Sequence, residues 1–128
     1  MTQPTLTGRR VLVVEDDDMI AAMVEAALEE AQCTVVGPFH DLAGALAAAK
    51  NQAFDVALLD VNLAGEMVFP VAEALDARGI PFMLLSGYGD GAAPDDRPDW
   101  PVCAKPFRLD ELVQRLGRLV QERPLATR

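Results

Sequence analysis

Single polar residues follow four apolar runs of the chain, and their types suit the binding of a cation and a phosphoryl group. They are Glu15 and Asp16 after the first run, Asp60 after a central run, Ser86 after the next and Lys105 after the last. Carboxylate oxygens are hard ligands that suit Mg²⁺, and carboxylates brought together repel unless a cation or a proton joins them. Lysine and serine add a positive charge and a hydroxyl donor, so the set could neutralise a phosphoryl group. Asp60, the central residue, is the candidate nucleophile for an acyl phosphate.

The apolar runs themselves predict five buried strands. They cover residues 10–14, 34–37, 55–59, 81–85 and 101–104, and the hydrophobicity of the longer runs is continuous, as in a parallel sheet covered on both faces. Stretches with helical spacing of apolar residues lie between the first four strands and after the fifth. No hairpin signal is present. This alternation predicts an α/β fold, a doubly wound parallel sheet with helices on both faces.

Local signals predict where helices begin and where one is missing. Asp17 or Asp18 is expected to cap the first helix, and Asp41 is expected to cap the second. Residues 87–101, between the fourth and fifth strands, contain three glycines and three prolines, which leave room for one helical turn at most. The fourth crossover helix is therefore predicted to be short or absent, with Trp100 anchoring the segment.

The carboxyl ends of parallel strands share one edge of a sheet, so the polar residues are expected to meet there. Each has an ordinary structural interpretation when it is taken alone, since Asp17 or Asp18 caps a helix and Lys105 pairs with any nearby carboxylate. Taken together, four strand ends with complementary chemistry favour a phosphoryl site.

Composition excludes several classes of function. The 128 residues carry a net charge of −9, which disfavours nucleic acid and anionic membranes as partners. No apolar run is long enough to span a bilayer and no secretory signal is present, which predicts a cytoplasmic location. Flexible ends are expected at residues 1–8 and 124–128, around one domain of residues 9–123. The two cysteines, Cys33 and Cys103, are too far apart for a zinc motif and are expected to be buried.

The chain from about residue 10 to residue 120 resembles the receiver domain of two-component response regulators. The matching landmarks are Glu15-Asp16-Asp17 after strand one, Asp60-Val61-Asn62 after strand three, Ser86-Gly87 after strand four and Lys105-Pro106-Phe107 after strand five. The resemblance implies a CheY-like, flavodoxin-like fold with strand order 2-1-3-4-5. It also implies a cis peptide bond between Lys105 and Pro106.

The resemblance implies a role for each site residue. Asp60 would accept a phosphoryl group from a phosphohistidine. Mg²⁺ (or Mn²⁺) would be bound by Asp60, by Asp16 and by the backbone carbonyl of Asn62, with Glu15 holding a metal-bound water.

Two further roles belong to the opposite side of the site. Lys105 would pair with the phosphoryl oxygens, and Ser86 would follow them when the domain switches. The protein would then be a phosphorylation-dependent switch rather than an enzyme, with self-catalysed phosphoryl transfer and dephosphorylation only.

The segment from Pro81 to Tyr88 is similar to the PFxFATGY motif of an atypical stand-alone group of receivers, often partnered with kinases of the HWE type. The family's usual aromatic switch residue is replaced by Val102. Tyr88 either takes over that role or packs in its loop, and the sequence leaves both open.

The implied partners are a sensor histidine kinase or a histidine phosphotransfer protein, and a downstream protein. A single-domain regulator, a phosphorelay intermediate and a fragment of a longer regulator all remain open. The main alternative is a pseudo-receiver that binds partners without phosphorylation. A haloacid-dehalogenase-like phosphatase is disfavoured by Asn62 in place of a second acid, and a flavin domain by Glu15-Asp16-Asp17. His40, the one histidine, is interpreted as a surface residue away from the acidic cluster.

Overall fold

The computed structural model describes residues 6–87, 94 and 96–121. Its strands are β1 (Arg10–Val14), β2 (Thr34–Phe39), β3 (Val56–Asp60), β4 (Asn62–Leu63), β5 (Glu66–Met67), β6 (Phe82–Ser86) and β7 (Val102–Ala104). Its helices are α1 (Asp18–Glu30), α2 (Leu42–Asn51), α3 (Phe69–Ala77) and α4 (Leu109–Gln121). None of the described helices is long and apolar enough to cross a membrane.

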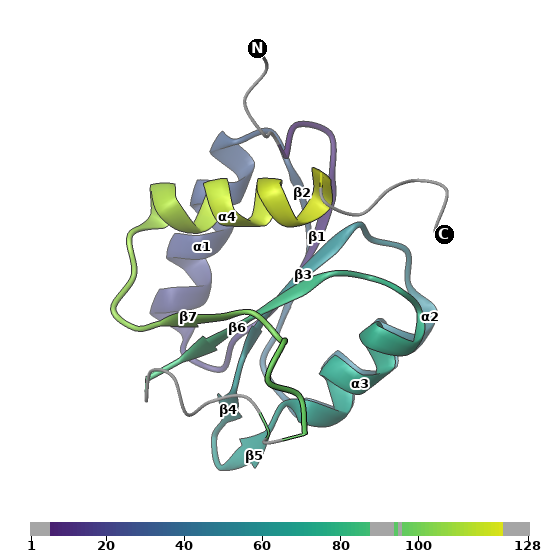
Figure 1. Cartoon of the computed structure of the whole chain (residues 1–128). Helices are drawn as coiled ribbons and strands as arrows, with labels where there is room; N and C mark the ends of the chain where they lie inside the picture. The colour runs from purple at the N-terminus through teal and green to yellow at the C-terminus, as the bar shows by residue number, and fades with distance from the viewer. Residues whose placement is uncertain (1–5, 88–93, 95, 122–128) are drawn as a thin grey trace.

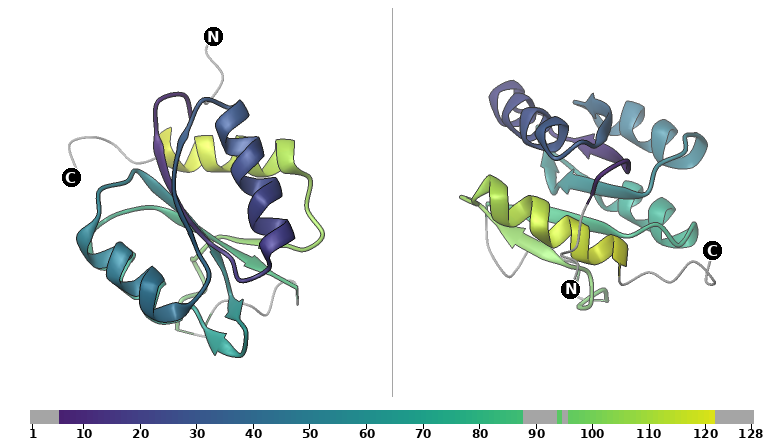
Figure 2. Two further views of the ribbon diagram at one scale, coloured as in Figure 1. Left: turned by 180° about the vertical axis from the view of Figure 1, so that it is seen from behind. Right: turned by 90° about the horizontal axis from the view of Figure 1, so that it is seen from above.

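The main sheet is parallel and has five strands in the order β2-β1-β3-β6-β7. Counted along this sheet alone, the order is 2-1-3-4-5, as predicted. Helices α1 and α4 cover one face, and helices α2 and α3 cover the other (Figures 1 and 2). The α/β, flavodoxin-like fold is therefore confirmed. The described residues between β6 and β7, which are 87, 94 and 96–101, contain no helix.

The central strands β1, β3 and β6 are buried on both faces because alternate side chains enter two separate hydrophobic clusters. In β1, Val11 and Val13 pack with α1 and α4, whereas Leu12 and Val14 pack with α2 and α3. This explains the unbroken apolar runs, since a strand covered on both sides has no solvent-facing position for a polar residue.

Trp100 closes the α2/α3 face where the segment before β7 crosses it. Its ring is 6% exposed and meets the ring of Phe82 edge-on, with 5.2 Å between the ring centroids. The Arg97 guanidinium lies over the Trp100 ring, 5.3 Å from its centroid, and forms an ion pair of 2.7 Å with Glu73 of α3. Trp100 thus anchors the described part of this segment, as predicted.

A two-stranded hairpin, β4–β5, follows β3 and was not predicted. Its turn residues, Ala64 and Gly65, have φ angles of 53° and 98°. Two successive positive φ angles are typical of a tight hairpin turn, for which asparagine or glycine is the usual first residue. Alanine in that position gives no hairpin signal, which is why the sequence did not reveal the turn.

The β2 edge contains a bulge that extends the strand beyond its predicted end at Gly37. Leu12 pairs with Val36, but Val14 pairs with Phe39, so β2 has one extra residue in this stretch. Gly37 has a φ of 106°, and a Cβ atom there would lie 2.8 Å from the Phe39 nitrogen and 3.0 Å from the Val13 oxygen. A residue without a side chain is therefore required at the bulge.

The packed part of the chain begins before residue 9. Leu6, placed by the sequence in a flexible N-terminus, is 2% exposed and its carbonyl accepts a hydrogen bond from the Arg9 nitrogen. The remaining predicted boundaries stay predictions, because residues 1–5 and 122–128 lie outside the described residues.

Candidate functional site

The acidic side of the site is the loop between β1 and α1. Glu15 is 2% exposed, and its carboxylate accepts a hydrogen bond of 3.1 Å from the Asp17 nitrogen. Asp17 in turn caps α1, since its Oδ1 accepts hydrogen bonds from the nitrogens of Met19 and Ile20. Asp17 is thus the capping residue of the two predicted. The cap and the Glu15 contact together fix where α1 begins relative to β1.

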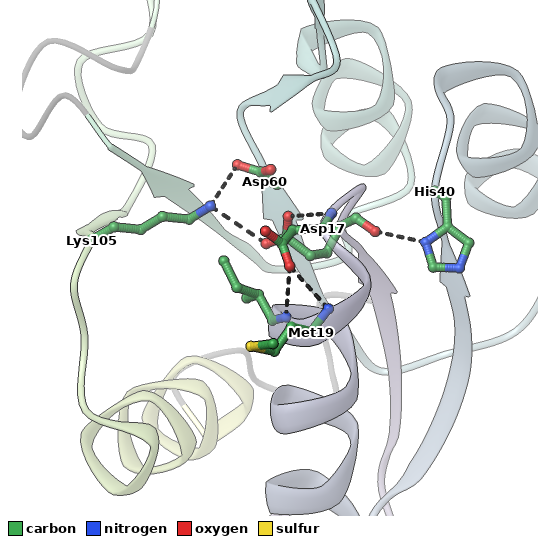
Figure 3. Close-up of polar contacts among 7 residues, drawn as sticks. Asp17, Met19, His40, Asp60 and Lys105 are labelled. Atoms are coloured by element: carbon green, nitrogen blue, oxygen red, sulfur yellow. Dashed lines mark hydrogen bonds and ion pairs between the residues drawn. The ribbon is translucent and has the colours of Figure 1, made fainter.

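Lys105 and Asp60 face this loop from the ends of β7 and β3 (Figure 3). The Lys105 Nζ lies 3.3 Å from Asp60 Oδ1 and 3.5 Å from Glu15 Oε1. Asp60 is 6% exposed, so its carboxylate has little contact with water. One ammonium group therefore bridges two buried carboxylates, one at the end of β3 and one in the loop that follows β1.

Burial and neighbouring charge disfavour the ionised form of Asp60. Loss of water, followed by the hydrogen bond and negative charge of Glu15, raises the pKa of Asp60 from 3.8 to about 7, although Lys105 opposes the shift. Burial acts to lower the pKa of Lys105, but the negative charges of Asp60 and Glu15 outweigh it and raise that pKa. The site is short of positive charge even with its lysine.

Three carboxylates converge where a cation would supply that charge. Glu15, Asp16 and Asp60 each place an oxygen within 4.8 Å of the other two, and Asp16 is half-buried beside its two buried partners. Hard carboxylate oxygens at this spacing fit Mg²⁺. The donor set and the excess negative charge thus both suit a divalent cation.

An open cleft of about 500 Å³ lies over these groups. Its lining includes Asp16, Asp60, Asn62, Gly65 and Lys105. The Asn62 side chain accepts a hydrogen bond of 2.7 Å from the Gly65 nitrogen, which holds the β4–β5 turn at the rim. A small group could therefore reach Asp60 from solvent.

The remaining predicted site residues lie beside the cleft or outside the described residues. Ser86 ends β6, is 1% exposed, and its carbonyl accepts a hydrogen bond of 2.7 Å from the Lys105 nitrogen. The peptide bond between Lys105 and Pro106 is cis, as expected. Tyr88 lies outside the described residues, so its role stays a prediction.

His40 is a surface residue, as the sequence indicated, but the expectation that it lies away from the acidic cluster was wrong. Its ring is half-exposed, but Nδ1 lies 2.9 Å from the backbone oxygen of Glu15. His40 thus borders the acidic loop on the side opposite Lys105 (Figure 3). The bulge at Gly37 carries it there, and no sequence pattern used above revealed that shift. Cys33 and Cys103 are buried free thiols, as predicted.

Comparison with protein families matches residues 11–117 to the response regulator receiver domain. The chain belongs to this family. Receiver domains are phosphoacceptor switches of two-component signalling that bind Mg²⁺ at an acidic site and interact with histidine kinases or phosphotransfer proteins. The acidic cluster at Asp60 therefore lies in a domain of a family that binds Mg²⁺ at an acidic site.

Some proteins that resemble this receiver are longer than it is. The transcriptional regulatory protein TcrA of Mycobacterium tuberculosis is 34% identical over 131 residues, which cover 94% of this chain and 49% of TcrA. The receiver thus spans about half the length of the curated relatives it matches.

Two solved structures match over nearly their whole lengths. SdrG from Sphingomonas melonis Fr1 is 41% identical with a TM-score of 0.76, over 89% of this chain and 97% of SdrG. The receiver domain of the sensor histidine kinase PA1611 from Pseudomonas aeruginosa PAO1 is 25% identical with a TM-score of 0.74, over 90% of this chain and 99% of that one. That structure has a magnesium ion coordinated in its active site cleft.

Proposed function

We propose that this receiver accepts a phosphoryl group on Asp60 from a phosphohistidine and signals through protein contacts. An Asp60 carboxylate oxygen forms the new bond to phosphorus as the bond between phosphorus and the histidine nitrogen breaks, and the histidine leaves with that electron pair. The convergence of Glu15, Asp16 and Lys105 around Asp60 carries this proposal. A phosphoryl group is negatively charged, so a buried carboxylate can accept it only if positive charge lies nearby. Lys105 and a bound cation would supply that charge.

Each side chain has a separate task in this transfer. Asp16, Asp60 and the backbone carbonyl of Asn62 would hold Mg²⁺ or Mn²⁺, with Glu15 binding a metal-bound water; the ion supplies positive charge for the phosphoryl oxygens. Lys105 leaves its ion pair with Asp60 and pairs with those oxygens instead.

The switch itself is assigned to the end of β6. Ser86 lies at this end, and its carbonyl is bonded to the backbone of Lys105, so a movement of either residue is passed to the other. In our proposal the Ser86 hydroxyl turns toward the phosphoryl oxygens, and Tyr88 acts as the aromatic residue that reports the change. Dephosphorylation is self-catalysed.

The proposed partners follow from the acidic surface and the class of protein. They are a sensor histidine kinase, including kinases of the HWE type, or a histidine phosphotransfer protein, and a downstream protein. A net charge of −9 argues against nucleic acid and membrane surfaces as direct partners. We propose a cytoplasmic location and a role as a single-domain regulator or phosphorelay intermediate.

The test is the intact mass of the protein after incubation with a small phosphodonor and Mg²⁺. One added phosphoryl group is expected in the wild-type protein and in Asp55→Asn, which changes the aspartate that precedes β3 at its other end. None is expected in Asp60→Asn or in the presence of EDTA. A sensor histidine kinase that carries a phosphohistidine is used as a second donor. Failure of both donors would contradict the proposal and favour a pseudo-receiver.

A further inference from the structure

We propose that His40 is a positioning residue for the metal-binding loop and acts through the backbone carbonyl of Glu15. The inference rests on the proposed function, because it concerns Mg²⁺ binding at the Asp60 cleft. His40 touches none of the groups that would bind the ion or the phosphoryl group directly. Its effect would be to fix the loop that carries two of the three clustered carboxylates, Glu15 and Asp16.

The first observation is that the end of β2 bonds both backbone groups of Glu15. The Glu15 nitrogen donates to the Phe39 oxygen over 2.9 Å, and the Glu15 oxygen lies 2.9 Å from His40 Nδ1. The Glu15 side chain is held separately, by the Asp17 nitrogen and by Lys105. Both backbone groups and the side chain of Glu15 therefore have partners. The bond to its carbonyl oxygen comes from the His40 side chain, just after β2.

The second observation is the β2 bulge, which sets the register of these bonds. Leu12 pairs with Val36, so continued pairing would place residue 38 opposite Val14; the bulge places Phe39 there instead. His40 consequently follows opposite Glu15 rather than one residue further along the loop. A one-residue slip in a strand changes which side chain faces a given point, so the bulge is what brings this ring to this carbonyl.

The third observation concerns the proton on the ring. A carbonyl oxygen can only accept a hydrogen bond, so Nδ1 carries the hydrogen in this contact. The nearest side-chain charge, Asp18 Oδ1, lies 3.8 Å away on a side chain that is 94% exposed, and such a pair contributes little. The bond to Glu15 is therefore the contact of His40 that bears on the site.

The bonded carbonyl belongs to the peptide unit that joins Glu15 to Asp16. Because that unit is planar, fixing the oxygen also fixes the direction of the Asp16 nitrogen and hence the start of the Asp16 residue. The His40 bond thus aligns the two successive acidic residues of the cluster. Preorganisation of this kind raises metal affinity because less ordering remains to be done when the ion binds.

The experiment compares three substitutions at His40 by calorimetric titration with Mg²⁺ and by urea unfolding without metal. In His40→Asn, the side-chain nitrogen is attached to Cγ, as Nδ1 is in histidine, so it can reach the Glu15 carbonyl. In His40→Gln the nitrogen is one bond further out, and His40→Ala has no donor. We expect the Mg²⁺ dissociation constant to rise about three- to tenfold in His40→Ala and His40→Gln, and to stay within twofold of wild type in His40→Asn.

Phosphorylation rates at a series of Mg²⁺ concentrations give a second readout. Loss of positioning raises the Mg²⁺ concentration for half-maximal rate and leaves the rate at saturating Mg²⁺ close to that of the wild type. Wild-type Mg²⁺ affinity in all three variants would overturn the inference, even if their stability in urea fell. Equal losses in Asn, Gln and Ala variants would also overturn it, since the donor position would then not matter. No Mg²⁺ binding by the wild-type protein would instead contradict the proposed function.

Discussion

The two faces of the sheet are closed by different means. On one face, α1 and α4 place most of their apolar side chains against the strands, and they contact each other along part of their length. On the other face, α2 and α3 cover part of the sheet, and Trp100 covers the area beside β6. Trp100 lies in residues 96–101, which form no helix. One aromatic side chain, held to α3 through Arg97 and Glu73, thus does part of the work that a helix does opposite.

Among the described residues before β7, the side-chain contacts with α3 and with Phe82 come from two residues, Trp100 and Arg97. A helix distributes its packing over many side chains, so the loss of any one leaves the rest in place. The described part of the segment that leads to β7 and Lys105 is held to α3 and to the Phe82 ring by these two side chains, and its Pro101 carbonyl accepts a hydrogen bond from the Leu84 nitrogen of β6. The stability of this face and the position of the site lysine are therefore linked.

The largest expected effect is the removal of the Trp100 ring. Trp100→Ala should lower the free energy of unfolding by about 3–5 kcal/mol, because a large buried side chain is lost from a packed face. Leu116→Ala, on α4, should cost about 2–5 kcal/mol. Urea unfolding of both proteins is the measurement. The comparison of faces predicts that Trp100→Ala also weakens Mg²⁺-dependent phosphorylation, whereas Leu116→Ala leaves it intact in the folded fraction; equal effects on phosphorylation would break it.

The pH dependence of stability reports on charge in the cleft rather than on packing of the two faces. The pKa of Asp60 is raised to about 7, so the protonated form is favoured by folding and its contribution is lost as the pH rises through 7. Without metal, the free energy of unfolding should therefore fall between about pH 4 and about pH 7 and level off above that, by a few kcal/mol at most.

Two controls identify Asp60 as the cause of this pH dependence. Asp60→Asn should remove most of the slope, and Mg²⁺ should restore stability to the wild-type protein at the higher pH. The same slope in Asp60→Asn would show that other groups set it.

The hairpin that leads into α3 gives a smaller and oppositely signed test. Ala64 has a φ of 53°, a region that costs an L-residue about 1 kcal/mol, so Ala64→Gly should stabilise the protein by up to about 1 kcal/mol. Gly65→Ala, at a φ of 98°, should destabilise it by at least as much. Thermal unfolding measures both. A loss of stability in Ala64→Gly would contradict the turn as described.

The smallest expected effect is the loss of the Arg97 side chain. Arg97→Ala removes its contacts with Trp100 and Glu73, so a small decrease in stability is expected, well below that of Trp100→Ala. Arg108→Ala is the control, since its described contact is with Asp110 two residues away. Arg108→Ala should leave the urea midpoint unchanged. A decrease of the same size in both variants would mean that the Arg97 contacts add nothing specific.

The sheet and most of the site could be predicted because the strands are apolar on both faces and end in single polar residues. Where Val14 gives way to Glu15, or Leu59 to Asp60, the change marks the end of a strand and the position of a functional group at once. The sheet edge then brings the four ends together without further information.

The features that could not be predicted depend on backbone conformations that the residue types do not reveal. Ala64 takes a turn conformation usual for glycine or asparagine, so β4–β5 had no signal. Gly37 and Pro38 resemble the end of a strand, although β2 continues to Phe39 through its bulge. The position of His40 against Glu15 follows from that bulge, and so it was missed as well.

The same bulge has a consequence for the outer edge of the sheet. β2 is an edge strand, and an uninterrupted edge is a template on which another chain can form β-sheet and aggregate. Pro38 has no N–H to offer, and the extra residue at Gly37 breaks the regular spacing of the neighbouring groups. The opposite edge strand, β7, has three residues. Neither edge presents the long regular ladder that amyloid-like pairing requires, so the described sheet is protected against such growth at both ends.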